Sequence, residues 1–308
     1  MKLGLIGAGH VGEIVAYTAA IRGLADQIVF HDINRERMRS ESLDIVDGSL
    51  FYPHRVQATF GDHEDLVDCD IIVVCSGLIP EEGDRLYEFE LNKDAVASYT
   101  KSVVEKGFDG YFIVVTNPCD IITYQVLRSS GFPANKVIGS GTALDSARFC
   151  AMLAERLNLA PSAVTGLMLG EHGESQFTPW SQVKVGPYPF DRFMEKYPEA
   201  LPDFDKDAFE ADVRGRGWEV FKGKQSTQYG IANTVNAIIR AIVHDTREIL
   251  CVSAHLDGEY GLEDLYISTP CVIGAHGIEE VLELDLTDEE LKRYHDSAKV
   301  IKEHIERL

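Results

Sequence analysis

The sequence lacks the cysteine patterns that mark disulfide-rich secreted proteins and zinc-binding modules. Its six cysteines are scattered along 308 residues, and no two stand in a C-x-x-C pair. Scattered cysteines are typical of reduced thiols in a cytosolic protein. We therefore expect no disulfide and no bound metal ion, and we expect a cytoplasmic protein.

Long apolar runs, flexible linkers and internal repeats are also missing. No stretch approaches the length of a membrane-spanning helix, so we expect no membrane association. Residues 1–12 already have the pattern of a strand and a glycine turn, which leaves no room for a signal peptide. Because single cores stop growing at roughly 250 to 300 residues, we expect two domains that share one body.

Basic residues are scarce relative to acidic ones. Lys and Arg number 29 against 50 Asp and Glu, which gives a formal net charge of -21. A field of this sign repels nucleic acids and anionic lipids, so neither is an expected partner. The acidic excess is spread over stretches predicted to be helical, such as residues 278–290, and we interpret it as a solubility feature.

The first half of the chain alternates short apolar runs with amphipathic stretches. The runs predicted as buried strands are residues 3–6, 27–31, 71–75, 111–116 and 136–138. Helical patterns separate them, which predicts an α/β fold with a doubly wound parallel sheet of the Rossmann type. Such sheets bind ligands beyond the carboxyl ends of their strands, so the loops after the first four runs are the expected functional loops.

The pattern changes near Gly141. A long helix is predicted over residues 143–157, and further segments are predicted as strand-like (165–169 and 182–185), an exposed loop (195–207) and helices (216–221 and 230–246). We therefore predict a dinucleotide-binding domain over residues 1–141 and an α+β substrate-binding domain over residues 142–308.

A glycine motif, GLIGAGHVG, joins the first predicted strand to the helix that follows. Gly7, Gly9 and Gly12 have the G-x-G-x-x-G spacing of dinucleotide-binding turns. The glycines permit a tight turn, and they let the N–H groups at the helix start, which include those of His10 and Val11, approach a pyrophosphate. A plain glycine turn is the alternative interpretation of this motif.

Asp32 strengthens the dinucleotide interpretation. It lies twenty positions beyond Gly12, at the end of the second predicted strand. A carboxylate at this position can accept hydrogen bonds from both hydroxyls of an adenosine ribose. Because it would repel a 2′-phosphate, Asp32 predicts NAD rather than NADP as the cofactor.

Several further motifs occur in an order that resembles the L-lactate/malate dehydrogenase family over the whole chain. They are VVTNPCDIITY at residues 114–124, GSGTALDSARF at 139–149, GEHGESQF at 170–177 and STQYGIA at 226–232. The segments EEGDRL and GFPANKVIG resemble the branch of L-2-hydroxyisocaproate dehydrogenases. The resemblance implies an NAD-dependent L-2-hydroxyacid dehydrogenase that acts on small 2-oxo and 2-hydroxy acids and forms a homodimer or homotetramer.

The resemblance also implies roles for individual residues. His172 would be the proton donor and acceptor, Asp145 would orient it, and Arg148 would grip the substrate carboxylate with its two-pronged guanidinium. Arg85 would come from a closing lid and polarise the substrate carbonyl, while Asn117 and Thr227 would bind substrate, Asn117 also lying at the cofactor.

Three of these positions have simpler explanations that the sequence leaves open. Thr142 and Asp145 have the spacing of a helix capping box, Thr227 could cap the next helix, and Asn117 could begin a turn before Pro118. A lone histidine such as His172 is usually structural.

The lid sequence CSGLIPEEGDR bears on the choice of substrate. In the family, the residue six positions before the lid arginine faces the substrate side chain, and here that residue is Ile79. The lid is one residue shorter than the usual lactate type, so Leu78, Pro80 or Glu81 could occupy the place instead. None is basic, which predicts poor use of malate and good use of longer or branched 2-oxo acids such as 2-oxoisocaproate.

Three other functions remain as alternatives at this point. A malate dehydrogenase belongs to the same family, and a catalytically idle NAD-binding structural or sensor protein could share the fold. An NAD-dependent glycosidase would need metal ligands and a larger sugar pocket. The joint presence of Arg85, Asn117, Asp145, Arg148 and His172 favours the dehydrogenase.

Overall fold

The computed structural model describes residues 1–77 and 85–306 of the chain, and it leaves out the side chains of residues 85–88, 90 and 91. Its central feature is one sheet in the strand order β12-β11-β10-β6-β5-β4-β1-β2-β3. Within the described residues, no helix has the length and apolarity that a membrane span requires.

The first half of the chain forms the parallel part of this sheet. Its strands are β1 (Lys2–Ile6), β2 (Gln27–His31), β3 (Gln57–Phe60), β4 (Ile71–Val74), β5 (Tyr111–Val114) and β6 (Val137–Gly139). Their order, 3-2-1-4-5-6, is that of the Rossmann fold, and the predicted fold class is confirmed. Only β3 was not predicted, because this short edge strand has no buried apolar run.

The register of these strands brings their carboxyl ends to one level. Ile6 pairs with both His31 and Val74, and Val114 pairs with both Val74 and Gly139. The loops that follow β1, β2, β4, β5 and β6 therefore emerge along a single edge of the sheet. This edge is the expected binding crevice.

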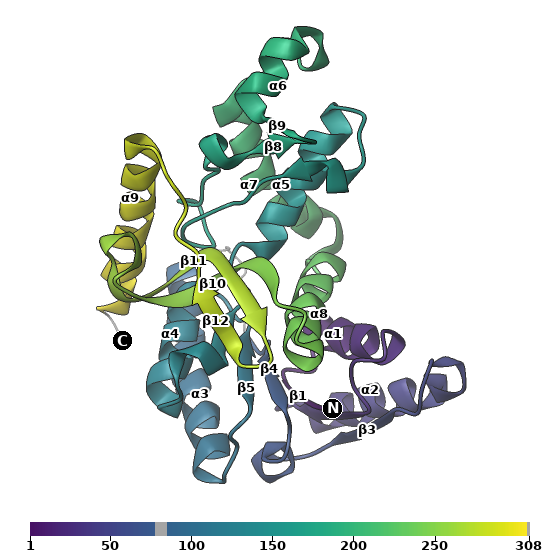
Figure 1. The fold of residues 1–308 in the computed structure, drawn as a ribbon. Coiled ribbons are helices and arrows are strands. Elements are labelled where there is room, and N and C mark those ends of the chain that lie inside the picture. Colours follow the sequence, from purple (N-terminus) through teal and green to yellow (C-terminus); the bar gives the residue numbers. More distant parts are fainter. Residues whose placement is uncertain (78–84, 307–308) are drawn as a thin grey trace.

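Helices cover both faces of the sheet. One face carries α1 (His10–Ile21), α2 (Arg35–Asp47) and α8 (Tyr229–His244), and the other carries α3 (Arg85–Glu105), α4 (Cys119–Ser130) and α9 (Asp288–Ile305) (Figure 1). Each face encloses its own apolar cluster, so the strands between them are buried on both sides.

The second half extends the same sheet with antiparallel strands. These are β10 (Glu248–Asp257), β11 (Glu263–Gly274) and β12 (Gly277–Val281), and β10 joins β6 where Ser253 pairs with Gly139. A Cβ on Gly139 would lie 2.6 Å from the Ser253 Cβ, so glycine permits this close approach. The chain's two halves are thus connected through the sheet.

The remaining elements form a lobe beyond the sheet edge (Figure 1). They are α5 (Ala143–Arg156), β7 (Val164–Thr165), β8 (Lys184–Val185), β9 (Tyr188–Pro189), α6 (Phe190–Lys196) and α7 (Lys206–Lys224). Aromatic side chains fill this lobe, with Trp180 in ring contact with Phe149, Phe190 and Phe209. The lobe carries α5 down to the sheet edge.

Several predictions for the second half need correction. Residues 278–290 were expected to be helical, but they begin with β12, and helix starts only at Asp288. Gly277 has φ +79° and closes a hairpin, so the following residues pair with β11. Of the strand-like pattern at 165–169, only Thr165 belongs to a strand, as the last residue of β7, and the exposed loop at 195–207 contains one short helical turn, at residues 198–200, between α6 and α7.

Candidate active site

The turn between β1 and α1 is shaped by its glycines. Gly7 has φ +109°, and a Cβ there would lie 2.5 Å from the Ser76 backbone nitrogen. A Cβ on Gly12 would lie 2.0 Å from the Gly7 carbonyl oxygen, so α1 packs closely under the turn. Cys75, which sequence analysis did not select, supports the same turn because its thiol donates to the Gly7 carbonyl.

Gly9 differs from its neighbours because a Cβ there would meet nothing within 4 Å. It is the N-cap of α1 and no side chain caps this helix, so the first N–H groups of the helix, at His10, Val11 and Gly12, receive no cap hydrogen bond. Open space before an uncapped helix start suits a pyrophosphate, which backbone N–H groups and the helix dipole attract.

Asp32 follows β2 at the same edge. Its carboxylate accepts hydrogen bonds from the Ala8 and Asn34 backbone N–H groups, each at 2.8 Å. The carboxylate is therefore held beside the glycine turn and remains partly exposed. The geometry fits a dinucleotide whose pyrophosphate meets the turn and whose ribose hydroxyls meet Asp32.

A second group of side chains gathers around Asp145 on the first turn of α5. One carboxylate oxygen accepts from Arg148 Nη1 at 2.9 Å, and the other lies 2.8 Å from His172 Nδ1. The Asp145 side chain is only 3% exposed, while those of Arg148 and His172 are 16% and 22% exposed. A single buried carboxylate thus joins a partly accessible guanidinium to a partly accessible imidazole.

The helix-cap explanation for this spacing does not hold in the structure. Thr142 stands before α5, but its side chain makes no cap hydrogen bond and donates instead to the Met168 carbonyl. Asp145 likewise turns away from the helix start and toward His172. Thr227 does not cap α8 either, because Gln228 occupies the N-cap position.

Two opposing effects act on the pKa of Asp145. Burial raises this pKa, but the adjacent His172 and Arg148 together lower it by more than burial raises it, so the net shift is downward. The carboxyl group is therefore ionised at neutral pH. An ionised partner at Nδ1 favours the imidazole tautomer with its proton on that nitrogen.

Asp120 is a site residue that sequence analysis missed. This carboxylate, 2% exposed, accepts the backbone N–H of His172 at 2.7 Å and the hydroxyl of Ser253 at 2.5 Å. Burial raises its pKa to about 6, although Ser253 and the His172 N–H act in the opposite direction. A signal was available, since Asp120 follows Asn117 by three residues and precedes a buried apolar run.

The turn that carries His172 is also fixed by the C-terminal helix. The Glu171 N–H donates to Ser297 Oγ on α9 at 2.8 Å. Gly170 has φ +98°, and a Cβ on it would lie 2.5 Å from the same oxygen. The backbone N–H groups of Glu171 and His172 therefore hold the turn against α9 and α4, respectively.

The other predicted site residues lie at the same edge or outside the described residues. Asn117 is half-buried just after β5, and Thr227 is half-buried just before α8. Ile79, together with its alternatives Leu78, Pro80 and Glu81, lies outside the described residues. Arg85 is the first residue of α3, and the description does not extend to its side chain.

Comparison with known sequences covers nearly the whole chain. Residues 1–139 match the lactate/malate dehydrogenase NAD binding domain, and residues 142–308 match the lactate/malate dehydrogenase alpha/beta C-terminal domain. An L-lactate dehydrogenase of Fusobacterium nucleatum is 38% identical over 305 residues, which cover 99% of this chain and 96% of the relative. L-lactate dehydrogenase 3 of Bacillus anthracis is 38% identical over 308 residues, covering 100% and 98%.

Solved structures give the same result. The minor L-lactate dehydrogenase of Enterococcus mundtii in a ligands-bound form has a TM-score of 0.95 and 33% identity, covering 100% of this chain and 98% of that one. A malate dehydrogenase from Salinibacter ruber has a TM-score of 0.90 and 31% identity, covering 99% and 97%. Both names in the family description are thus represented among the similar structures.

The glycine turn yields a prediction with an internal control. Gly7→Ala should lower the free energy of unfolding by roughly 1 to 3 kcal/mol, because it combines a left-handed φ with a backbone clash. Gly9→Ala has room for its methyl group and should keep its thermal midpoint within a few degrees.

The methyl group of Gly9→Ala would nevertheless occupy the space before the start of α1, so the affinity for NADH should fall at least about tenfold. Thermal melts and NADH fluorescence titration measure the two effects. Unchanged NADH affinity in Gly9→Ala would place the dinucleotide elsewhere.

Proposed function

The chain belongs to the lactate/malate dehydrogenase family, and on that premise we propose how its residues interconvert L-2-hydroxy acids and 2-oxo acids with NAD. The observation that carries the proposal is the buried Asp145 carboxylate, which contacts both Arg148 and His172. A carboxylate-binding cation and a proton-transferring imidazole, held by one group, are what a 2-oxo acid requires.

NAD, when bound, supplies the redox chemistry as a hydride carrier. Gly7, Gly9 and Gly12, with the N–H groups of His10 and Val11, would hold its pyrophosphate, and Asp32 its adenosine ribose. The edge of the sheet would then place the nicotinamide end toward Asn117, beyond β5. The fit of the turn to a pyrophosphate, described above, supports this arrangement.

Arg148 binds the substrate carboxylate in this proposal. Its Nη1 is occupied by Asp145, which fixes the plane of the guanidinium while part of the group stays accessible. A fixed planar fork can donate two parallel hydrogen bonds to a carboxylate. Asn117 and Thr227 are assigned by family resemblance to orient the substrate.

His172 donates a proton to the oxygen of the 2-oxo acid as it is reduced and accepts that proton in the reverse direction. Contact of Nδ1 with Asp145 assigns the transfer to Nε2. The Asp145 charge stabilises the imidazolium that forms when the hydroxy acid is oxidised. Arg85 is assigned by family resemblance to polarise the substrate carbonyl from the lid.

Replacement of His172 tests this assignment. His172→Asn should bind NADH with wild-type affinity, because the imidazole is not among the groups proposed to hold the dinucleotide, but kcat should fall at least about a hundredfold, the low end for general acid catalysis. Stopped-flow or steady-state oxidation of NADH with pyruvate gives the rate, and fluorescence titration gives the affinity. Near-normal kcat would remove His172 from the mechanism.

The substrate class is proposed to extend to longer or branched 2-oxo acids, as in the L-2-hydroxyisocaproate dehydrogenase-like branch. Gly217 on α7 faces Arg148, and a Cβ there would lie 3.4 Å from Nη1 and 3.7 Å from Nη2. Glycine therefore leaves the volume of a methyl group beside the carboxylate-binding guanidinium. Additional space next to this group favours a bulkier substrate.

This proposal predicts good use of 2-oxoisocaproate, equal to or better than that of pyruvate. Gly217→Ala should lower kcat/KM for 2-oxoisocaproate about tenfold more than for pyruvate, because one methyl group fills space that only the larger acid needs. Gly215→Ala is the matched control, since it lies on the same helix and its Cβ would meet nothing within 4 Å.

A panel of 2-oxo acids, measured by NADH oxidation, gives the comparison. Equal losses for both acids in Gly217→Ala would exclude a role for Gly217 in substrate size. The highest kcat/KM with oxaloacetate would favour the malate alternative, while inactivity across the panel would favour an idle NAD-binding protein.

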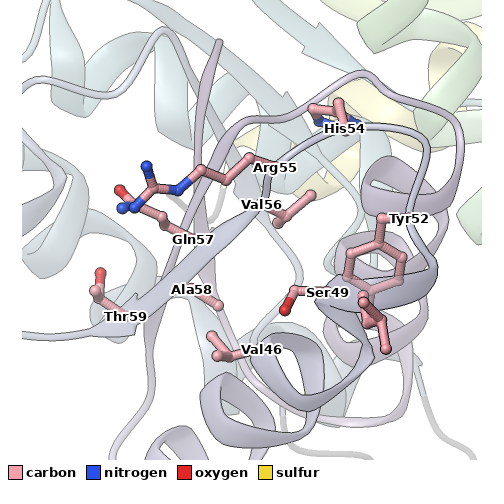
Figure 2. A pocket seen from close by; sticks show the side chains of 10 residues that line it. Val46, Ser49, Tyr52, His54, Arg55, Val56, Gln57, Ala58 and Thr59 are labelled. Carbon is pink, nitrogen blue, oxygen red and sulfur yellow. The ribbon is translucent and has the colours of Figure 1, made fainter.

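A homodimer or homotetramer is the proposed assembly. Exposed large apolar side chains gather on α1, α2, the turn after α2 and the start of α8: Tyr17, Ile21, Leu43, Val46, Leu50, Phe51 and Tyr229. Leu50 and Phe51 are 83% and 84% exposed. Figure 2 shows a groove next to them, with Val46, Tyr52 and Val56 in its wall. Apolar surface of this kind marks protein interfaces, and a second copy of the chain is the proposed occupant.

Light scattering after size exclusion tests the assembly. The wild-type chain should have at least twice the mass of one chain, and Leu50→Glu combined with Phe51→Glu should shift it toward the monomer, because buried unpaired carboxylates oppose association. Leu159→Glu, at an exposed position in the outer lobe, should leave the mass unchanged. A monomeric wild-type protein would contradict the proposal.

The proposed location is the cytoplasm, consistent with six unpaired cysteines.

A further inference from the structure

We propose that Asp120 is a positioning residue: it holds the main chain of His172 in the position that proton transfer by the imidazole requires. The inference deepens the proposed function and rests on it, because it assigns a second carboxylate to the same imidazole. Asp120 itself does not touch the substrate in this proposal. It acts only through the backbone of His172.

The two carboxylates hold opposite ends of His172. Asp145 contacts ring Nδ1 at 2.8 Å, and Asp120 accepts the backbone N–H at 2.7 Å. A contact at Nδ1 alone would let the ring pivot about that nitrogen while the main chain shifts. When the backbone is also fixed, the position of Nε2 relative to the substrate is held closely enough for proton transfer.

Asp120 is itself held rigidly. The Ser253 hydroxyl donates to its second carboxylate oxygen at 2.5 Å, and Ser253 is fully buried where β10 joins β6. Asp120 also lies in the first turn of α4, where the helix dipole favours a carboxylate. A buried carboxylate with both oxygens hydrogen-bonded is a fixed reference point.

Asp120 connects the two halves of the chain at the edge of the sheet. It belongs to the half of the chain that carries the glycine turn, three residues after Asn117 at the sheet edge. His172 belongs to the other half, and the bond between them spans 52 residues of sequence. The proton donor is thereby positioned relative to the same edge that would hold the nicotinamide and the substrate.

The role requires a hydrogen-bond acceptor rather than a permanent charge. The residues that face Asp120 are His172, Glu171 and Ser253, and burial raises its pKa to about 6. When protonated, the carboxyl group can donate to Ser253 Oγ and still accept the His172 N–H through its other oxygen. An asparagine side chain can make the same pair of contacts, so it should replace Asp120 functionally.

The experiment compares Asp120→Ala and Asp120→Asn in the wild-type and His172→Asn backgrounds. Asp120→Ala should lower kcat with pyruvate by about ten- to a hundredfold, the effect of misplacing a reacting group by about 1 Å, while the dissociation constant of NADH changes less than about twofold. Asp120→Asn should recover most of kcat. In the His172→Asn background, Asp120→Ala should add less than about a twofold loss.

Three results would overturn the proposal. They are wild-type kcat in Asp120→Ala, the same fold loss in both backgrounds, or an Asp120→Asn variant as slow as Asp120→Ala. A purely structural role predicts losses in NADH binding and thermal midpoint that do not depend on His172.

Ser253→Ala keeps the test decisive if Asp120→Ala does not fold. It leaves the His172 contact in place but frees Asp120 to move, so it should cause a few-fold loss of kcat that disappears in the His172→Asn background. A loss that persists there, or no loss at all, contradicts the inference. Failure of the proposed function is distinguishable, because the wild-type enzyme would then be inactive across the panel of 2-oxo acids.

Discussion

The ionised carboxylate of Asp145 is the interaction on which the site depends. A carboxylate this deeply buried would be unfavourable by several kcal/mol without partners, and His172 and Arg148 offset that penalty. The same contacts orient the imidazole and fix the guanidinium plane. Removing Asp145 takes the shared partner from both Arg148 and His172, so the three groups act as a unit.

In the proposed mechanism this unit depends on the sheet, which brings the glycine turn proposed for the cofactor to the same edge. The level register of β1, β2, β4, β5 and β6 aligns the loops that carry the glycine turn, Asp32 and Asn117 along one edge. The start of α5, which carries Asp145 and Arg148, lies at this same edge, directly after β6. The residues proposed to bind the cofactor and those proposed to act on the substrate therefore meet at one edge of the sheet.

The continuity of the sheet keeps the two sets in register. The antiparallel strands of the second half extend the parallel sheet at the contact of Gly139 with Ser253, instead of forming a separate layer. Ser253 in turn contacts Asp120, and Asp120 contacts the backbone of His172. Relative motion between the halves would have to break buried hydrogen bonds, which is unfavourable when no water can replace them.

The features that the sequence predicted are those carried by short segments. Gly7, Gly9 and Gly12 shape a local turn, and the apolar runs of five parallel strands have buried neighbours within a few residues. Asp145 and Arg148 are one helical turn apart. The contact of Asp145 with His172, 27 residues away, was implied by family resemblance and not by spacing. The meeting of Asp120 with His172 and Ser253, and the pairing of β10 with β6, depended on the whole path of the chain. Hydrogen bonds between segments so far apart leave no periodic pattern in either segment, because each partner is selected by where the rest of the fold places it.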